Sequence, residues 1–146
     1  MATEHNDFYQ HLKISINYWL EQKGVNNEFA KHIKLAPELF KLTCQLSLEK
    51  SVSLEDKAKF AVAIAYFISP YDMYPEAFAG VIGYSDDIIL IAFVLNSVLE
   101  NISEKLINKL WKYESDLKQV VNEILLDAEE MVGAKLFLKL KALVDY

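Results

Sequence analysis

The chain begins with a helical pattern of apolar positions. Between residues 6 and 23 apolar side chains return every three or four positions, as they do on one face of an α-helix. Gly24 follows directly and is a natural stop, because glycine readily adopts the left-handed conformation that ends many helices. We therefore expect an amphipathic helix over residues 6–23, with a buried stripe made of Phe8, Leu12, Ile16, Trp19 and Leu20.

The outer parts of the chain predict further helices. Two short ones are expected over residues 27–35 and 37–50, and a long one from a Ser103 cap to Gly133. The tail over residues 134–144 favours a final helix, although its alternating pattern also permits a strand. The long helix should pack through a seam of Leu106, Leu110, Tyr113, Leu117, Val120, Ile124, Ala128 and Met131. Its opposite face should carry Lys109, Lys112, Asp116, Glu123, Asp127 and Glu130.

Two capping signals occur in the middle of the chain. Ser53 with Asp56 three residues later forms a capping box, which opens a helix over residues 54–68. The pattern recurs over residues 69–72, Ser-Pro-Tyr-Asp, where we expect a helical turn that changes the direction of the chain. An irregular connection over residues 73–84 should follow, since this stretch contains a proline and two glycines.

A continuous apolar run predicts the next helix. We expect Ser85, Asp86 and Asp87 in its first turn, where acidic side chains interact favourably with the positive end of the helix dipole. Every residue from 88 to 95 is apolar, and a helix that is apolar on all sides must be surrounded by other elements. The helix over residues 85–101 should therefore form the centre of the fold.

Together these elements predict an all-α fold: a compact, single-domain bundle of about six to seven helices around a buried central hairpin. Residues 54–99 should form the hairpin, and residues 1–53 and 101–146 should be helical arms of the same domain. The longest uncharged stretches, residues 60–71 and 88–99, have twelve residues each. A membrane-spanning helix needs about 20 apolar residues, so neither stretch is expected to cross a bilayer.

The N-terminus and the single cysteine indicate a cytoplasmic protein. Residues 1–7 are polar and acidic, without the basic start and apolar run of a signal peptide. Cys44 has no second cysteine to pair with and lies at helical spacing among leucines, so we expect a buried apolar residue rather than a reactive thiol. This cysteine usage suits a reducing compartment.

The charge distribution argues against nucleic acid as a partner. The net charge is −6 and every basic residue is lysine. Arginine is the preferred residue for forked contacts to phosphates and bases, so an acidic chain without arginine is a poor nucleic-acid binder. Residues 51–102 contain seven acids and two lysines and thus carry −5 of the net charge. If the chain has a protein partner, we expect that partner to have a basic surface.

The turn between the two hairpin helices carries a family resemblance. Residues 65–87 read AYFISPYDMYPEAFAGVIGYSDD. This segment resembles the YkvA-like family, a bacterial domain of unknown function. The family's hallmark is a Ser-Pro-x-Asp-x-x-Pro-Asp turn, followed by a glycine-containing loop and an Asp-Asp pair that opens an apolar helix, and Glu76 stands here where the family usually has the last Asp of the turn. The resemblance covers about residues 54–99 and implies the helical hairpin, but no established activity. The matching residues are Ser69, Pro70, Asp72, Pro75, Gly83, Asp86 and Asp87.

Four acids near this turn have several possible roles. Asp72, Glu76, Asp86 and Asp87 lie at the two ends of the hairpin turn, and no basic residue is close in sequence. Converging carboxylates raise one another's pKa unless something balances them. They could cap helices, meet lysines from the arms, hold a hard cation through oxygen ligands, or receive a basic partner. The frequency of aspartate at helix starts favours capping, and the same four acids are the candidate metal ligands.

The sequence gives little support for catalysis. His5, His11 and His32 are not spaced as a ligand pair, and we expect them to be surface or partly buried residues. There is neither a nucleophile motif of the Gly-x-Ser-x-Gly type nor a glycine-rich phosphate loop. We therefore expect no catalytic residue, no cofactor and no enzymatic activity.

Aromatic residues in the turn are candidates for partner binding. Tyrosine is favoured at interfaces because it is apolar with a polar tip, but such residues can equally fold back as a lid on the core. The candidates are Tyr71, Tyr74, Phe78 and Tyr84, together with Glu76.

Two functional hypotheses follow, with a third behind them. The first is a non-enzymatic, acidic interaction module that binds another protein as an accessory or regulatory subunit. The second is peripheral membrane association through the apolar hairpin or the tail, where Lys135, Lys139 and Lys141 stand beside leucine and phenylalanine. The third is a metal-dependent enzyme that uses the acidic turn.

Overall fold

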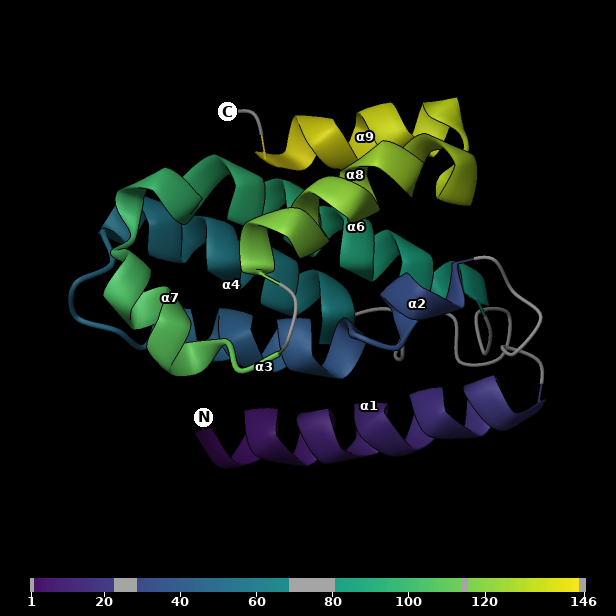
Figure 1. The fold of residues 1–146 in the computed structure, drawn as a ribbon, viewed down its shortest axis with the longest axis horizontal. Coiled ribbons are helices and arrows are strands. Elements are labelled where there is room, and N and C mark those ends of the chain that lie inside the picture. The colour runs from purple at the N-terminus through teal and green to yellow at the C-terminus, as the bar shows by residue number, and fades with distance from the viewer. Residues whose placement is uncertain (1, 23–28, 69–80, 114–115, 145–146) are drawn as a thin grey trace.

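The computed structural model describes residues 2–22, 29–68, 81–113 and 116–144 (Figure 1). Within these ranges every regular element is a helix and no residue belongs to a β-strand, which confirms the predicted all-α fold. None of the helices in the described ranges is both long and apolar enough to cross a bilayer. In chain order the elements are α1 (Ala2–Gln22), α2 (Ala30–Ile33), α3 (Ala36–Ser47), α4 (Leu54–Ile68), α6 (Val81–Val98), the 3₁₀ turn η2 (Leu99–Asn101), α7 (Glu104–Leu110), α8 (Leu117–Val132) and α9 (Ala134–Val144).

Helix α6 lies in the middle of the molecule. In Figure 1 it has α9 above it and α4, α3 and α1 in succession below it, and it contacts α2, α3, α4, α8 and α9. Residues 88–92, 94 and 95 are all buried. Phe93 is half-buried and packs against Phe137 of α9, with ring centroids 5.3 Å apart. The prediction that the apolar run after Asp87 forms the centre of the core is confirmed.

Several helix ends form as the local sequence predicts. The backbone N–H of Asp56 donates to Ser53 Oγ at 3.1 Å, and α4 covers the predicted residues. The backbone N–H of Leu106 donates to Ser103 Oγ at 3.2 Å. Gly133 adopts a φ of 86°, which side chains rarely tolerate, and separates α8 from a helical tail. The strand alternative for the tail is therefore wrong. The tail forms helix α9, whose Leu140 and Val144 pack into the core.

Helix α1 is attached to α3 by a polar cluster as well as by apolar contacts. The hydroxyl of Tyr9 donates to both carboxylate oxygens of Glu38, at 3.0 and 3.1 Å. The ammonium groups of Lys13 and Lys41 lie 5.2 and 5.3 Å from the centre of the Tyr9 ring. Burial, followed by the hydrogen bond and the charge of Glu38, raises the pKa of Tyr9 to about 12, so this tyrosine stays a donor.

The predicted helix from Ser103 to Gly133 is wrong, because the chain forms α7 and α8 there. The break is at Trp111, which has an extended backbone and a buried side chain. An unbroken helix would fix the direction of the indole and of the following helix together, whereas the break lets Trp111 reach the core and α8 lie along α6. The predicted seam survives where α8 is buried, at Leu117, Val120, Ile124 and Ala128, but Tyr113 is exposed.

The predicted start of the central helix is also wrong. Helix α6 begins at Val81, so Asp86 and Asp87 lie in its second turn rather than its first. A single glycine inside a helix costs about 1 kcal/mol relative to alanine, so Gly83 does not end a helix that has a long buried segment. Other boundaries also differ from the prediction: α1 begins at Ala2 rather than residue 6, and α3 ends at Ser47 rather than residue 50.

His32 is buried, which corrects the expectation of a surface or partly buried histidine. Its side chain is 2% exposed, and its Nε2 lies 2.7 Å from Asp127 Oδ2 on α8. Asp127 is half-buried and belongs to this contact, although the sequence placed it on the solvent face of its helix. The pair joins α2 to α8 across 95 residues of sequence, which is why helical spacing alone did not reveal it.

The burial of α6 predicts a large effect of truncation there and a small one elsewhere. We expect L90A to lower the free energy of unfolding by about 2–5 kcal/mol, because a cavity would form at a side chain that is fully buried. The control is L126A on α8, where the leucine is 82% exposed and the same change should stay within about 0.5 kcal/mol. Urea denaturation measures both values. Equal losses in the two variants would show that α6 is not the core.

Candidate functional site

Asp86 and Asp87 form a buried acidic pair near the start of α6. The free N–H groups of a helix belong to its first turn, and these two residues lie beyond it, so their expected capping role is wrong. Asp87 is only 4% exposed and Asp86 is half-buried. The Oδ1 atom of each carboxylate is buried and accepts no hydrogen bond from the part of the chain that the structure describes.

Burial changes the proton affinity of this pair. It raises the pKa of Asp86 from 3.8 to about 6. Burial, together with the charge of Asp86, raises the pKa of Asp87 well above its ordinary value. Tyr66 of α4 is half-buried. Burial, followed by the charges of Asp86 and Asp87, raises the pKa of Tyr66 to about 12. The three side chains therefore form one cluster, which we call the acidic pair site, between the two hairpin helices.

The structure argues against two of the four proposed roles of Asp86 and Asp87. Neither residue caps a helix, and neither carboxylate forms an ion pair with a lysine in the described part of the chain. A hard cation or a proton would neutralise them, because an unpaired buried charge is strongly unfavourable. The described residues contain no group of three His, Cys, Asp or Glu that could hold a metal ion, so protein ligands for a cation would number two here.

The other predicted site residues fall mainly outside the described ranges. These are the metal candidates Asp72 and Glu76 and the partner-binding candidates Tyr71, Tyr74, Glu76 and Phe78. Tyr84 lies in the first turn of α6, two residues before Asp86, and the structure describes only its backbone.

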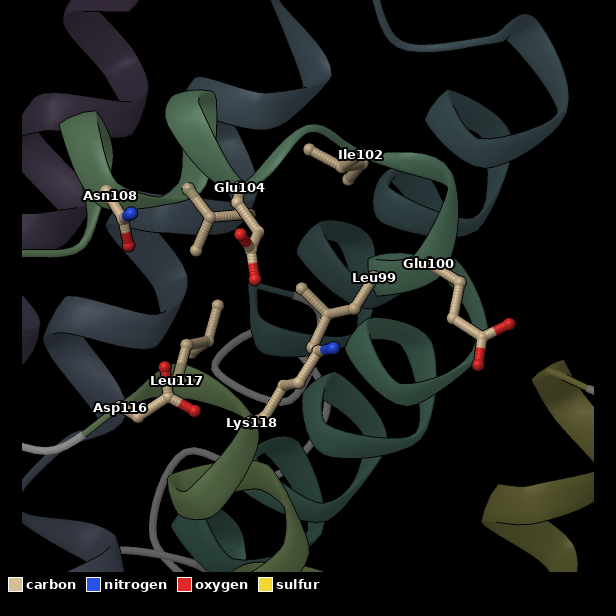
Figure 2. A pocket seen from close by; sticks show the side chains of 9 residues that line it. Leu99, Glu100, Ile102, Glu104, Asn108, Asp116, Leu117 and Lys118 are labelled. Atoms are coloured by element: carbon tan, nitrogen blue, oxygen red, sulfur yellow. The ribbon is translucent and has the colours of Figure 1, made fainter.

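A second candidate site is a pocket of about 340 Å³ beside η2, at the other end of α6 (Figure 2). Its apolar lining comes from Leu99 of η2, Ile102 just before α7, Ile107 within α7 and Leu117 at the start of α8. Glu104 and Lys118 extend toward the space between η2, α7 and α8, whereas Glu100 points to the outer side (Figure 2). The lining residues are Leu99, Glu100, Ile102, Glu104, Ile107, Asn108, Asp116, Leu117 and Lys118.

The sequence did not indicate this pocket. It exists because the chain breaks between α7 and α8, which brings Glu104 and Asp116 to the same opening. Three acidic residues and one lysine line the pocket, with the Glu100 side chain pointing to its outer side, so the lining is acidic, and leucine and isoleucine side chains supply its apolar part. Such a lining suits a ligand that combines a cationic group with an apolar part.

Comparisons with known proteins place the chain in a family. A family model described as "Protein of unknown function (DUF1232)" matches residues 56–93. An uncharacterised protein, ORF9 of Methanothermobacter thermautotrophicus, is 30% identical over 114 residues, covering 77% of this chain and 78% of its own length. The chain belongs to the DUF1232 family. The resemblance seen in the turn sequence is confirmed, and no solved structure matches.

The DUF1232 segment and the two candidate sites overlap only in part. Tyr66, Asp86 and Asp87 all lie within residues 56–93, so the acidic pair site belongs to the segment that the family model describes. The pocket begins at Leu99 and lies wholly after that segment. Chemistry shared within the DUF1232 family is therefore to be sought at the acidic pair, and chemistry particular to this chain at the pocket.

The burial of Asp86 and Asp87 predicts that the free energy of unfolding falls as the pH rises. The folded chain keeps protons on Asp86 and Asp87 that the unfolded chain releases near about pH 4, so both groups lower stability as the pH rises. For Asp86 this loss extends from about pH 4 to about pH 6. We expect D87N, which keeps the shape and removes the charge, to raise the unfolding free energy at pH 7.5 by about 1–3 kcal/mol.

Urea denaturation between pH 4 and pH 8, in the presence of EDTA, tests this expectation. The loss of stability with rising pH should be smaller in D87N than in the wild type. The control is D116N, which removes an exposed carboxylate and should leave the profile unchanged. If the D87N profile coincides with that of the wild type, burial of the Asp87 carboxylate does not lower the stability of the folded state, and the prediction is wrong.

Proposed function

We propose that this protein is a non-enzymatic, acidic interaction module that binds a basic segment of another protein at the pocket beside η2. In this role it acts as an accessory or regulatory protein in the cytoplasm. The pocket carries the proposal, because it combines apolar side chains with mainly acidic charged residues in one opening. A segment with leucine-like and lysine-like side chains on one face satisfies both features.

The surface next to the pocket is also both apolar and acidic. The amide of Asn101 donates to Asp56 Oδ2 at 3.3 Å and so joins η2 to the first turn of α4. That turn presents Leu54, which is 85% exposed, and Glu55. Leu54 and Glu55 thus combine an apolar and an acidic side chain, as the pocket lining does, and they enlarge the surface that a partner could bury.

The cysteine is consistent with a reducing compartment. Burial raises the pKa of Cys44 to about 12, so the thiol stays protonated and unreactive at neutral pH. Its position on α3, inside the core, supports the role of a small apolar residue. The cytoplasmic location is proposed on this basis.

Charge reversal at the pocket tests the proposal. We expect tagged wild-type protein to capture a partner from lysate of its native host, and the triple variant E100K/E104K/D116K to lose it, because like charges then face the basic segment. The control is E123K/E129K/E130K, which changes the net charge equally on exposed positions of α8. Glu129 is about 20 Å along the helix from Asp116.

Mass spectrometry of the captured proteins gives the result. A protein retained by the wild type and the control, lost by the pocket variant and released by 0.5 M salt is the expected outcome. The same set of proteins captured by all three forms would contradict binding at the pocket.

The outer face of α9 supports a second candidate, contact with an anionic membrane surface. Lys135, Lys139 and Lys141 are exposed there beside Leu138, which is 63% exposed. However, Leu140 and Val144 pack into the core, and the apolar run of α6 is buried, so these parts are already occupied within the fold. The apolar area left for lipid is therefore small.

Flotation with vesicles separates the two candidates. We expect the protein to stay at the bottom of a gradient with phosphatidylglycerol vesicles, because a few exposed leucines and lysines give little membrane affinity. The variant K135E/K139E/K141E serves as the control for charge. Wild-type protein that floats, while this variant stays at the bottom, would favour the membrane candidate over the pocket.

A further inference from the structure

The outer faces of α8 and α9 carry opposite charges around exposed leucines. On α8, Leu126 is 82% exposed, and the exposed charged side chains from residue 123 to residue 130 are all acidic. On α9, Leu138 is 63% exposed, and every exposed charged side chain is a lysine. We call these faces the acidic strip (residues 123–130) and the basic strip (residues 135–141). Their charged side chains are Glu123, Glu129 and Glu130, and Lys135, Lys139 and Lys141.

The stability of the helices does not account for these charges. Acids are favourable near the start of a helix and bases near its end, because of the helix dipole. Here Glu129 and Glu130 lie in the last turn of α8 and Lys135 lies in the first turn of α9, so these charges oppose the dipoles. In the described part of the chain none of the six charged side chains forms an ion pair, although α8 and α9 contact each other. The two strips are therefore available to another molecule.

The two strips lie side by side with their leucines in register. Helices α8 and α9 both contact α6, and they run in opposite directions from Gly133 (Figure 1). At 1.5 Å per residue, Leu126 lies about 10 Å before Gly133 and Leu138 lies about 8 Å after it. The two leucines are thus at nearly the same height, each among charges of one sign.

We propose that a second copy of this chain binds to this surface and forms a symmetric dimer. A two-fold axis that runs between α8 and α9 places the acidic strip of each copy on the basic strip of the other, so the same contact occurs twice. Leu126 then packs against the partner's Leu138, and the charged side chains surround this apolar centre as the polar rim of an interface does. The dimer goes beyond binding at the pocket, because the residues that line the pocket lie outside both strips.

A second copy satisfies both strips, whereas other occupants satisfy only one. An anionic membrane or a nucleic acid would attract the three lysines but would also meet the three glutamates beside them. A basic protein segment would suit the acidic strip and be repelled by the basic strip. The self-complementary charge of the surface is the observation that favours a second copy.

Charge reversal of each strip tests the dimer. By sedimentation velocity at about 0.1 mM chain, where a dimer with a micromolar dissociation constant is mostly formed, we expect the wild type to have twice the 16.8 kDa of one chain. The variants E123K/E129K/E130K and K135E/K139E/K141E should each raise the dissociation constant at least tenfold, because like charges then face each other in both contacts. An equimolar mixture of the two variants should form a heterodimer, since one variant is basic on both helices and the other is acidic on both.

The matched control is the pocket variant E100K/E104K/D116K, which changes the net charge as much as E123K/E129K/E130K does. It should remain a dimer, and its dissociation would overturn the proposal. In the wild type, 0.5 M salt should weaken the dimer, a test that requires no variant to fold. A monomeric wild type, or a mixture of the two strip variants that stays monomeric, would also overturn the proposal. A monomeric wild type that floats with phosphatidylglycerol vesicles would assign the basic strip to a membrane instead.

Discussion

The structure depends on the burial of one apolar helix. From residue 88 to residue 95 the chain offers no polar side chain to water, so α6 is stable only when other helices cover it on all sides. Helices α2, α3, α4, α8 and α9 provide that cover, and α1 is added outside α3. The same requirement explains the break at Trp111, since an unbroken helix would hold α8 away from the surface of α6 that it covers.

The two acids at the beginning of this run follow from the same arrangement. Because Asp86 and Asp87 precede a segment that must be buried, the helices that cover α6 also cover them. Their carboxylates therefore lose water, and the pKa of each is raised by burial. A fold would not gain stability from this arrangement alone, which makes the acidic pair the part of the DUF1232 segment most in need of a functional explanation.

The two candidate sites lie at opposite ends of the central helix and differ in chemistry. The acidic pair is covered and holds carboxylate oxygens without hydrogen-bond partners. The pocket beside η2 is open, mixes apolar and acidic side chains and suits a segment of another protein. Helix α6 connects them, and the first turn of α4 joins η2 through the hydrogen bond that the Asn101 amide donates to Asp56.

Local sequence determined much of the secondary structure, because its signals act within a few residues. The Ser53 and Ser103 caps, the stop at Gly133, the extent of α4 and the burial of residues 88–92, 94 and 95 all follow from side chains close in the chain. The family resemblance was likewise readable from a short turn. What only the tertiary structure decided involves residues far apart or elements whose direction depends on the core: the contact of His32 with Asp127, the break at Trp111 and the pocket that the break creates. Spacing along a helix cannot reveal these features, since each arises when burial of α6 brings separate helices together.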